Sequence, residues 1–402
     1  MIRLRFVLGL LVVGSVFFAV KTETVSLSNV ELPLDQYGEK LITGEASVMY
    51  HDRFWWFYFN NWGSCPGVDC CPTSGGCASC CFDSYTNYTP GCGGTQNGSD
   101  PYGLYHTIQA YRSPDLKTWE NMGTALRLTD RPNGTMFRPC VVYNAKTDLF
   151  VMWYEDRGSG LSNYQVATSE TAEGPFTSIV GGSGPMPDRG KIGDYNIFID
   201  DDQQAYHVRT GFEIVRLDDT YTKPSAHVAS FTTPKPSEAP TLFKRNSTYY
   251  ITAGTGCCAC LGGSSIYVLS APALTGPWTF QGDVGSNPTP FDPHSPHNYV
   301  TKAQGSAIFH VGRDIIYLGN QWNSGLSESP PGPRNHDLLY FGVLEFEAAS
   351  DVVCKHEIQE HKGGKPVQLS CPNGAIDEVL FAAWGTPSGS CTGAPPLAHN
   401  SS

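Results

Sequence analysis

The stretch EAPTLFKRNSTYYIT, residues 238–252, contains the pattern that decides the fold. A charged residue, Glu238, stands before an apolar run, and a polar turn at Lys244 and Arg245 separates that run from a second one rich in aromatic and β-branched residues. Two such runs joined by a short polar bend are typical of a β-hairpin. We therefore expect two antiparallel strands here, with Glu238 at the start of the first.

The same pattern recurs along the 402-residue chain at intervals of roughly 40 to 90 residues, the range for propeller blades with insertions. Its five copies are EASVMYHDRFWWFYF from Glu45, FRPCVVYNAKTDLFVMWY from Phe137, DYNIFIDDDQQAYHV from Asp194, EAPTLFKRNSTYYIT from Glu238 and QGSAIFHVGRDIIYLG from Gln304. This repeat predicts an all-β fold, a five-bladed β-propeller over residues 32–348.

Several copies are followed by a turn and a short run that carries one large aromatic residue, namely Trp119, Phe176 or Trp278. We expect each of these runs to form the outer strand of a four-stranded antiparallel blade. Packing between neighbouring blades is the expected role of the three aromatic side chains.

Propeller geometry also predicts which residues lie together. The residue that opens each copy begins the innermost strand of its blade, so the five openers should surround one end of the central channel. These openers are Glu45, Phe137, Asp194, Glu238 and Gln304. A cysteine-rich insertion in blade one, residues 62–98, and the cysteines of residues 254–264 in blade four should overhang the same face.

Composition indicates the compartment. A basic start, an apolar run from Phe6 to Val20 and a polar continuation predict a signal peptide at residues 1–20, with an uncleaved anchor as the alternative. The 14 cysteines and five Asn-x-Ser/Thr sites suit a secreted, extracellular, disulfide-bonded glycoprotein. The spacing of Cys77 and Cys80 leaves a zinc site as the competing interpretation.

Charge limits the partners. The formal net charge is −12, which disfavours nucleic acid and anionic membranes as ligands. No apolar run after the signal peptide is long enough to span a membrane, so we expect no membrane association after cleavage. A neutral sugar meets no such electrostatic penalty.

Three of the five openers, Glu45, Asp194 and Glu238, are acids. Carboxylates that converge from separate blades are what glycoside hydrolysis needs, because one group protonates the leaving oxygen while another activates water or attacks carbon. Crowding of like charges also raises the pKa of one of them. The sequence therefore predicts a glycosidase site, although solvated strand ends at the channel mouth are the simpler alternative for any single acid.

Here the sequence resembles glycoside hydrolase family 43. The segments SEAPTLFKRNSTYYIT and DYNIFIDDDQQAYHV resemble the family's general-acid strand and the strand whose first Asp modulates the pKa of that acid, and YRSPDLKTWENMG resembles an element of its first blade. The resemblance implies an inverting enzyme with Glu238 as the general acid and Asp194 as its modulator. We expect no cofactor and no metal-ligating residues in this chain, although some members of the family hold a structural calcium ion in the channel.

The base stays open between two residues. Most of the family has an Asp in the first blade, where this chain has Glu45; the branch that acts on β-1,3-galactan uses a Gln of the fifth blade, where this chain has Gln304. RPCVVYNAKTDLFVMWYED and YLGNQWN resemble two strands of the same branch, with Phe137 and Asn320-Gln321 in place of its charged residues. The residues expected to bind substrate are Glu155, Arg138, Trp62, Trp153, Trp322 and Gln321, with core packing as the alternative role of the three tryptophans.

Beyond Cys354, the segment KPVQLSCPNGAIDEVLFAAWGTPSGSC resembles a galactose/rhamnose-binding lectin domain of the sea-urchin-egg type. The resemblance covers the first half of such a domain, so residues 354–402 are expected to form a truncated, small α/β lectin-like segment. It implies a galactose-rich polysaccharide or oligosaccharide partner.

Taken together, the sequence predicts a secreted hydrolase that releases galactose from β-1,3-galactan or arabinogalactan. The alternatives are an α-L-arabinofuranosidase or β-xylosidase of the same clan, and a carbohydrate-binding protein without catalytic activity. Retention of Glu238 together with Asp194 favours the enzyme over the binder.

Overall fold

The structure is a computed structural model. It describes residues 2–4, 25–41, 44–61, 107–132, 135–157, 164–187, 192–234, 236–254, 264–285, 303–312, 314–322, 338–346, 387–388 and 398–399. Within these residues the chain forms strands and a single short 3-10 helix, Leu128–Asp130. None of the helices found there could cross a membrane.

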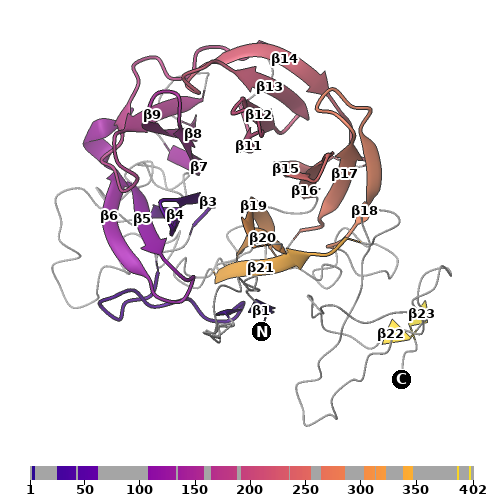
Figure 1. Ribbon diagram of the computed structural model, residues 1–402, viewed down its shortest axis with the longest axis horizontal. Helices are drawn as coiled ribbons and strands as arrows, with labels where there is room; N and C mark the ends of the chain where they lie inside the picture. Colours follow the sequence, from indigo (N-terminus) through magenta and orange to yellow (C-terminus); the bar gives the residue numbers. More distant parts are fainter. Residues whose placement is uncertain are drawn as a thin grey trace, which may run out of the picture.

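Five antiparallel sheets surround a central axis and form a five-bladed β-propeller, as the repeat predicts (Figure 1). Blade one contains β3 (Ala46–His51), β4 (Phe54–Asn61), β5 (Thr107–Ser113) and β6 (Glu120–Leu126). Blade two contains β7 (Thr135–Asn144), β8 (Leu149–Arg157), β9 (Gln165–Ser169) and β10 (Thr177–Ser178). Blade three contains β11 (Tyr195–Ile199), β12 (Ala205–Arg209), β13 (Glu213–Leu217) and β14 (Pro224–Ser230).

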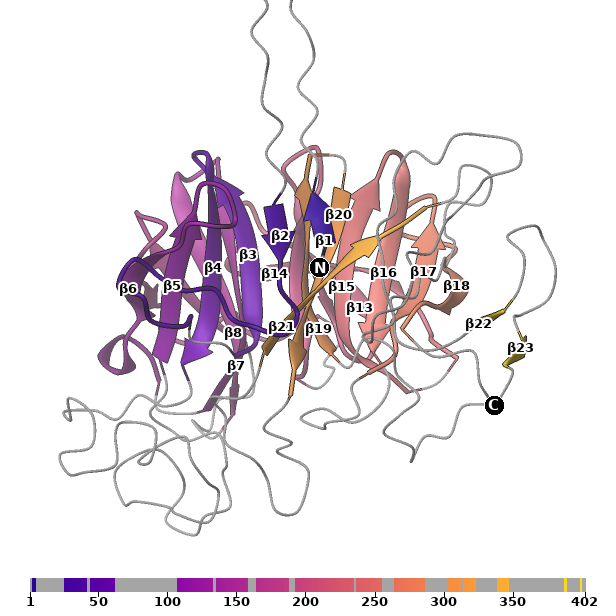
Figure 2. The ribbon, with the colours of Figure 1, turned by 90° about the horizontal axis from the view of Figure 1, so that it is seen from below.

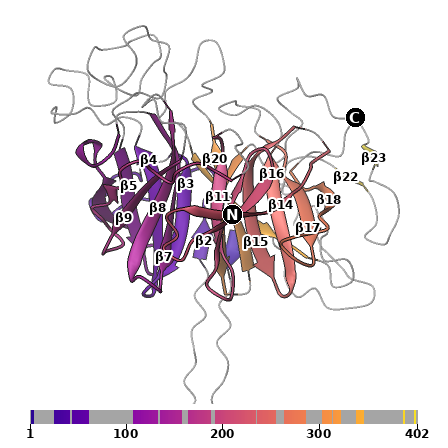
Figure 3. The same ribbon diagram turned by 90° about the horizontal axis from the view of Figure 1, so that it is seen from above.

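Blade four contains β15 (Glu238–Arg245), β16 (Thr248–Gly254), β17 (Tyr267–Ala271) and β18 (Thr279–Asp283). Blade five differs from the expected four strands, because its described part has three: β19 (Gln304–Val311), β20 (Asp314–Gln321) and β21 (Leu338–Leu344). In every blade the first strand lies innermost (Figure 1), and the two side views show the strands running along the propeller axis (Figures 2 and 3).

Alternation along the strands explains the core. In β4, Trp55 and Phe57 face blade five, whereas Trp56 and Tyr58 face blade two. The same alternation around the ring produces five hydrophobic clusters, one at each interface between neighbouring blades. Because successive side chains of a strand point to opposite faces, each blade contributes to two clusters.

The three aromatic residues before the outer strands pack between blades, as predicted. Trp119 contacts Phe57 edge-on in the cluster between blades five and one. Phe176 contacts Tyr58 of the preceding blade, and Trp278 contacts Phe231.

An N-terminal segment, residues 25–41, closes the ring between blade five and blade one (Figure 1). The Asn29 side chain accepts a hydrogen bond from the Phe341 amide (2.8 Å) and donates one to the Phe341 carbonyl (3.1 Å), along the outer strand β21. Further on, Asp35 forms a bridge with Trp119, next to β6. This segment also contains β2 (Val25–Leu27), which pairs with β1 (Ile2–Leu4).

Several sequence predictions lie mainly outside the described residues. They include most of the signal peptide, the cysteine-rich insertion 62–98, the cysteines of blade four and the lectin-like segment, of which the structure describes only β22 (Pro387–Ser388) and β23 (Ala398–His399). Among the described residues the one cysteine is Cys140, whose buried thiol is free.

Candidate active site at the channel

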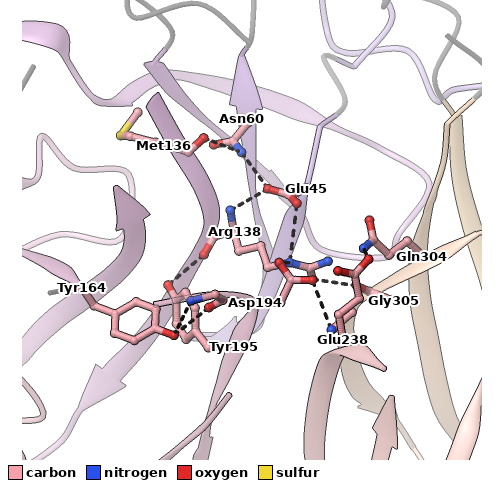
Figure 4. A network of polar contacts seen from close by, with 12 residues as sticks. Glu45, Asn60, Met136, Arg138, Tyr164, Asp194, Tyr195, Glu238, Gln304 and Gly305 are labelled. Carbon is pink, nitrogen blue, oxygen red and sulfur yellow. Dashed lines mark hydrogen bonds and ion pairs between the residues drawn. The ribbon is translucent and has the colours of Figure 1, made fainter. Parts of the chain in front are cut away.

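Four of the five openers meet around the propeller axis. Glu238 and Gln304 are the first residues of β15 and β19, and Glu45 and Asp194 directly precede β3 and β11. Figure 4 shows their side chains converging from four blades. The repeat register therefore brings these residues together as predicted.

Blade two contributes Arg138 to the centre rather than the expected opener Phe137. The pairing of β7 with β8 shifts between Phe137 and Cys140, which marks a β-bulge, and Arg138 has a φ of 51°. A bulge redirects side chains next to it. Arg138 is 5% exposed and contacts groups of three other blades.

The contacts of Arg138 define the centre of the site (Figure 4). Its Nε lies 2.7 Å from Oδ1 of Asp194 and 3.5 Å from Oε1 of Glu45. Its Nη1 donates to the carbonyl of Gly305 (2.8 Å), and its backbone N–H donates to Oε2 of Glu45 (2.7 Å). Burial alone would lower the pKa of Arg138, but Asp194, Glu45 and Glu238 outweigh burial and raise it, so the guanidinium stays charged.

Glu45 is the acid whose protonation state is most sensitive to this environment. Burial raises its pKa to about 7, with Arg138 opposing the shift and Asp194 adding to it. Besides Arg138, the Asn60 amide donates to its Oε2 (3.3 Å). A carboxyl with a pKa near neutrality is suited to exchange protons at physiological pH.

Asp194 is positioned from both sides. Its Oδ2 accepts a hydrogen bond from the backbone amide of Ala239 (3.1 Å), the residue after Glu238. The Tyr164 hydroxyl donates to the carbonyl of the preceding Gly193 (2.6 Å) and accepts from its amide (3.1 Å). Asp194 therefore joins blades three and four next to Glu238.

Glu238 and Gln304 are in direct contact. The Gln304 amide Nε2 donates to Oε1 of Glu238 (2.7 Å), and Oε1 of Gln304 accepts from the Trp322 indole N–H (3.0 Å). Gln304 and Trp322 are each 4% exposed, and Glu238 is half-buried. The expected acid and one of the two candidate bases are thus neighbours.

The other residues that were expected to bind substrate are buried in the core, engaged in contacts with other strands, or outside the described residues. Trp153 has no exposed surface: its indole donates to the Tyr221 carbonyl (2.7 Å) in the core between blades two and three, which is the core-packing alternative. Glu155 is 1% exposed. The Gln321 amide donates to the carbonyls of Asn29 and Leu339, so it joins the N-terminal segment to β21. Trp62 lies outside the described residues.

Three supporting residues carried no signal in the sequence analysis. The Asn60 amide donates to Glu45, and the Tyr164 hydroxyl is hydrogen-bonded to both backbone groups of Gly193. The Tyr195 hydroxyl donates to the Arg138 carbonyl (2.8 Å). Their positions give a partial clue, since Asn60 is the second-last residue of β4 and Tyr195 follows the opener Asp194.

The charges at this centre do not fit a calcium ion between Glu45 and Asp194. The carboxylates of Asp194 and Glu45 are paired with the Arg138 guanidinium, which supplies the positive charge between them. In the part of the chain that the structure describes, no group of three or more His, Cys, Asp or Glu side chains is arranged to hold a metal ion.

The arrangement supports acid–base chemistry. It combines three carboxyl groups, one guanidinium that acts electrostatically on all three, and a carboxamide hydrogen-bonded to Glu238. Carboxyl groups held in different environments can divide the roles of acid and base between them.

Comparison with known proteins agrees with this chemistry. Residues 97–321 match the sequence model of glycosyl hydrolases family 43. No curated protein matches the chain.

Solved structures share the fold. An exo-β-1,3-galactanase from Phanerochaete chrysosporium, solved with galactose, is 21% identical (TM-score 0.59) over 81% of this chain and 66% of its own. An exo-β-1,3-galactanase from Clostridium thermocellum is also 21% identical (TM-score 0.59), over 81% of this chain and 64% of its own. An α-L-arabinofuranosidase from Clostridium thermocellum is 17% identical (TM-score 0.51), over 77% of this chain and 92% of its own. The chain thus spans slightly less than two thirds of either galactanase structure.

Proposed function

Because the chain belongs to glycosyl hydrolases family 43 and is therefore a glycosidase, we propose that it releases galactose from β-1,3-linked galactan or arabinogalactan. One observation carries the proposal: the side chains of Glu45, Asp194 and Glu238 converge from three blades (Figure 4), with Glu45 and Asp194 on the buried Arg138 and Glu238 in contact with Gln304. The two galactanase structures, which match over 81% of this chain, support the choice of substrate.

Glu238 is the general acid in this proposal. It is half-buried at the start of β15, and its carboxyl group contacts Gln304. The acid protonates the leaving glycosidic oxygen and becomes a carboxylate in the same step. Asp194, linked to the backbone of Ala239 and paired with Arg138, holds this strand end and the neighbouring charge in place.

Two side chains qualify as the base that activates the water. An inverting enzyme needs acid and base roughly 6.5–9.5 Å apart, with a water between them. Gln304 contacts Glu238 at 2.7 Å, so it must separate from Glu238 before a water fits between them. The pKa of Glu45, about 7, suits a base, but its side chain is only 5% exposed, so a water has little access to it.

The substrate experiment offers defined β-1,3-galactooligosaccharides to the full-length protein and measures released galactose. We expect turnover by the parent protein and a loss of at least about 100-fold in kcat for Glu238→Gln, since general acid catalysis contributes about that factor or more. Glu120→Gln, an acid of the outer strand β6 paired with Arg112, is the matched control and should keep full activity. Parent protein that binds these oligosaccharides without turnover would refute the proposal.

A second experiment separates the bases. Glu45→Gln and Gln304→Ala are compared for kcat on the same substrate, with the anomer of the product followed by NMR. The variant that loses more than about 100-fold identifies the base, and full activity in both would eliminate both assignments.

The α-L-arabinofuranosidase structure motivates a second candidate activity. Arabinofuranosides and xylosides of matched leaving group, assayed beside galactosides, decide between the two. Higher kcat/KM on the arabinofuranoside would replace the galactan proposal while leaving Glu238 in the same role.

We also propose that the protein is secreted. The basic and apolar N-terminal run and the five Asn-x-Ser/Thr sites support this. Recovery of a protein from the culture medium of a eukaryotic host, with a mobility that changes on deglycosylation, is the expected result; retention in the cell would contradict it.

A further inference from the structure

The contact between Trp322 and Gln304 decides which way the Gln304 amide points. An indole N–H only donates hydrogen bonds, whereas a carboxamide has one accepting oxygen and one donating NH2 group. The Trp322 N–H therefore requires the Gln304 oxygen on its side. The NH2 group must then face Glu238, which is the direction of the 2.7 Å hydrogen bond between them.

Trp322 is itself held firmly. It follows Gln321, the last residue of β20, whose amide donates to the carbonyls of Asn29 (2.7 Å) and Leu339 (2.8 Å). Because both Trp322 and Gln304 are 4% exposed, neither side chain has much water around it to replace a lost partner. A buried donor or acceptor without a partner costs about 1–3 kcal/mol, so the indole imposes one amide orientation.

This orientation matters for the proposed acid. An NH2 group that faces Glu238 stabilises the carboxylate that forms when the proton passes to the leaving oxygen. Such an interaction is stronger in the transition state than in the ground state, so it contributes to kcat. In the opposite orientation the amide oxygen would face that carboxylate and repel it.

We propose that Trp322 is a positioning residue for catalysis: it fixes the Gln304 amide with the NH2 group toward Glu238. The proposal rests on Glu238 acting as the acid and replaces stacking on a sugar ring as the role of Trp322. It differs from a purely structural role, because Trp322 acts through Gln304.

The test is a double-mutant cycle on the full-length protein. Trp322→Phe removes the N–H and keeps an aromatic ring; we expect kcat to fall about 10-fold, with KM within about twofold, since one charge-stabilising hydrogen bond is worth roughly that factor. In a Gln304→Ala background the same change should cost nothing further. Equal losses in both backgrounds would overturn the proposal, because residues that act through one another are not additive.

Trp278→Phe is the matched control. The Trp278 indole also donates a hydrogen bond, to the Leu274 carbonyl (3.3 Å), but at the start of the outer strand β18. Its kcat should equal that of the parent protein. Thermal melting of each variant shows whether it is folded at the assay temperature.

A measurement that does not depend on catalysis can test the role of Trp322 separately from the proposed galactanase activity. Protein labelled with 15N-glutamine gives a side-chain NH2 signal for Gln304, identified by its loss in Gln304→Ala. We expect this signal to shift and its hydrogen exchange to accelerate at least about 10-fold in Trp322→Phe, since the amide is then free to rotate. An unchanged signal would refute the positioning role even if the protein is inactive on galactan, and a changed signal supports it in either case.

Discussion

Arg138 places one positive charge among carboxylates from three other blades. The side chains of Arg138, Glu45 and Asp194 are 5%, 6% and 15% exposed, so water contributes little to the stabilisation of their charges. Removing one member of a buried ion pair leaves an uncompensated charge, which costs about 3–5 kcal/mol. We expect Arg138→Met to lower the free energy of unfolding by about that amount, measured by urea denaturation at pH 7.

The exposed pair of Lys146 and Asp219 provides the control, because it is a lysine–carboxylate contact at the surface. Lys146→Met should cost about 1 kcal/mol or less, as surface ion pairs do. Similar losses in both variants would show that the Arg138 network contributes no more than a surface pair.

Glu45 makes stability depend on pH. Its pKa is about 7 in the folded protein, against 4.5 for the unperturbed group. The folded state therefore binds the proton more tightly, and its stabilising effect is present below pH 4.5 and lost as the pH rises through about 7. One pKa unit corresponds to about 1.4 kcal/mol, so the loss is on the order of 3 kcal/mol.

Glu45→Gln should remove this dependence. The difference in unfolding free energy between parent and variant, measured by urea denaturation from pH 4.5 to pH 8, should change in favour of the variant as the pH rises. A difference that stays constant over this range would contradict the raised pKa of Glu45.

At the residue level, the repeat register predicted Glu45, Asp194, Glu238 and Gln304 as neighbours, since all open the innermost strand of a blade. It did not predict that Arg138, instead of the opener Phe137, would place its side chain at the centre of the site. That change results from a bulge, and a bulge depends on backbone pairing that apolar alternation does not encode. Nor did it predict that the Trp322 indole would contact an amide.

At the level of elements, two bulges set the direction of the catalytic side chains. The pairing of β15 with β16 shifts between Glu238 and Thr241, and Ala239 has a φ of 54°, close to the 51° of Arg138 in β7. Each of these residues precedes a proline, which has no N–H to donate to a ladder. The bulge leaves the Ala239 amide free to donate to Asp194.

Substitutions at Ala239 test this bulge. Glycine tolerates a positive φ and keeps the N–H, so Ala239→Gly should retain activity within about twofold. A β-branched residue is strongly disfavoured there, so Ala239→Val should lower kcat at least about 10-fold by displacing Glu238 and Asp194. Ala226→Val in the outer strand β14 is the control for adding the same side chain to a strand. Equal activity of the two Ala239 variants would show that the bulge does not position the site.

The hairpins themselves were predictable, since all five pairs of first and second strands follow the apolar runs. The turn in blade four was placed too early: Lys244 and Arg245 belong to β15, and the turn lies at residues 246–247. Short outer strands were harder to predict: β10 has two residues, and the described part of blade five has no fourth strand. These elements are held by contacts with neighbouring segments rather than by their own periodicity, which is why sequence alone defines them poorly.

At the scale of the whole molecule, the described part of blade five has three strands. Along its outer strand β21, side-chain hydrogen bonds from the N-terminal segment take the place of a fourth strand. Asn29 satisfies both the amide and the carbonyl of Phe341. Asn29→Ala should therefore destabilise the protein by about 1–3 kcal/mol and increase hydrogen exchange at β21, with kcat unchanged at 25 °C. Gln281→Ala, which removes an exposed amide on β18, is the control. Unaltered exchange at β21 in Asn29→Ala would contradict closure by this residue.

The contacts that build the centre join parts of the chain that are far apart in sequence: Arg138 and Gly305 are separated by 167 residues, Arg138 and Glu45 by 93, and Glu238 and Gln304 by 66. Contacts of this kind form slowly, because long stretches of chain must lose their freedom before any contact stabilises them. A chain emerging from the ribosome holds no complete site until its fifth blade is made. Enzymatic activity should therefore return in the last kinetic phase of refolding, after the fluorescence changes that report burial of tryptophans between individual blades.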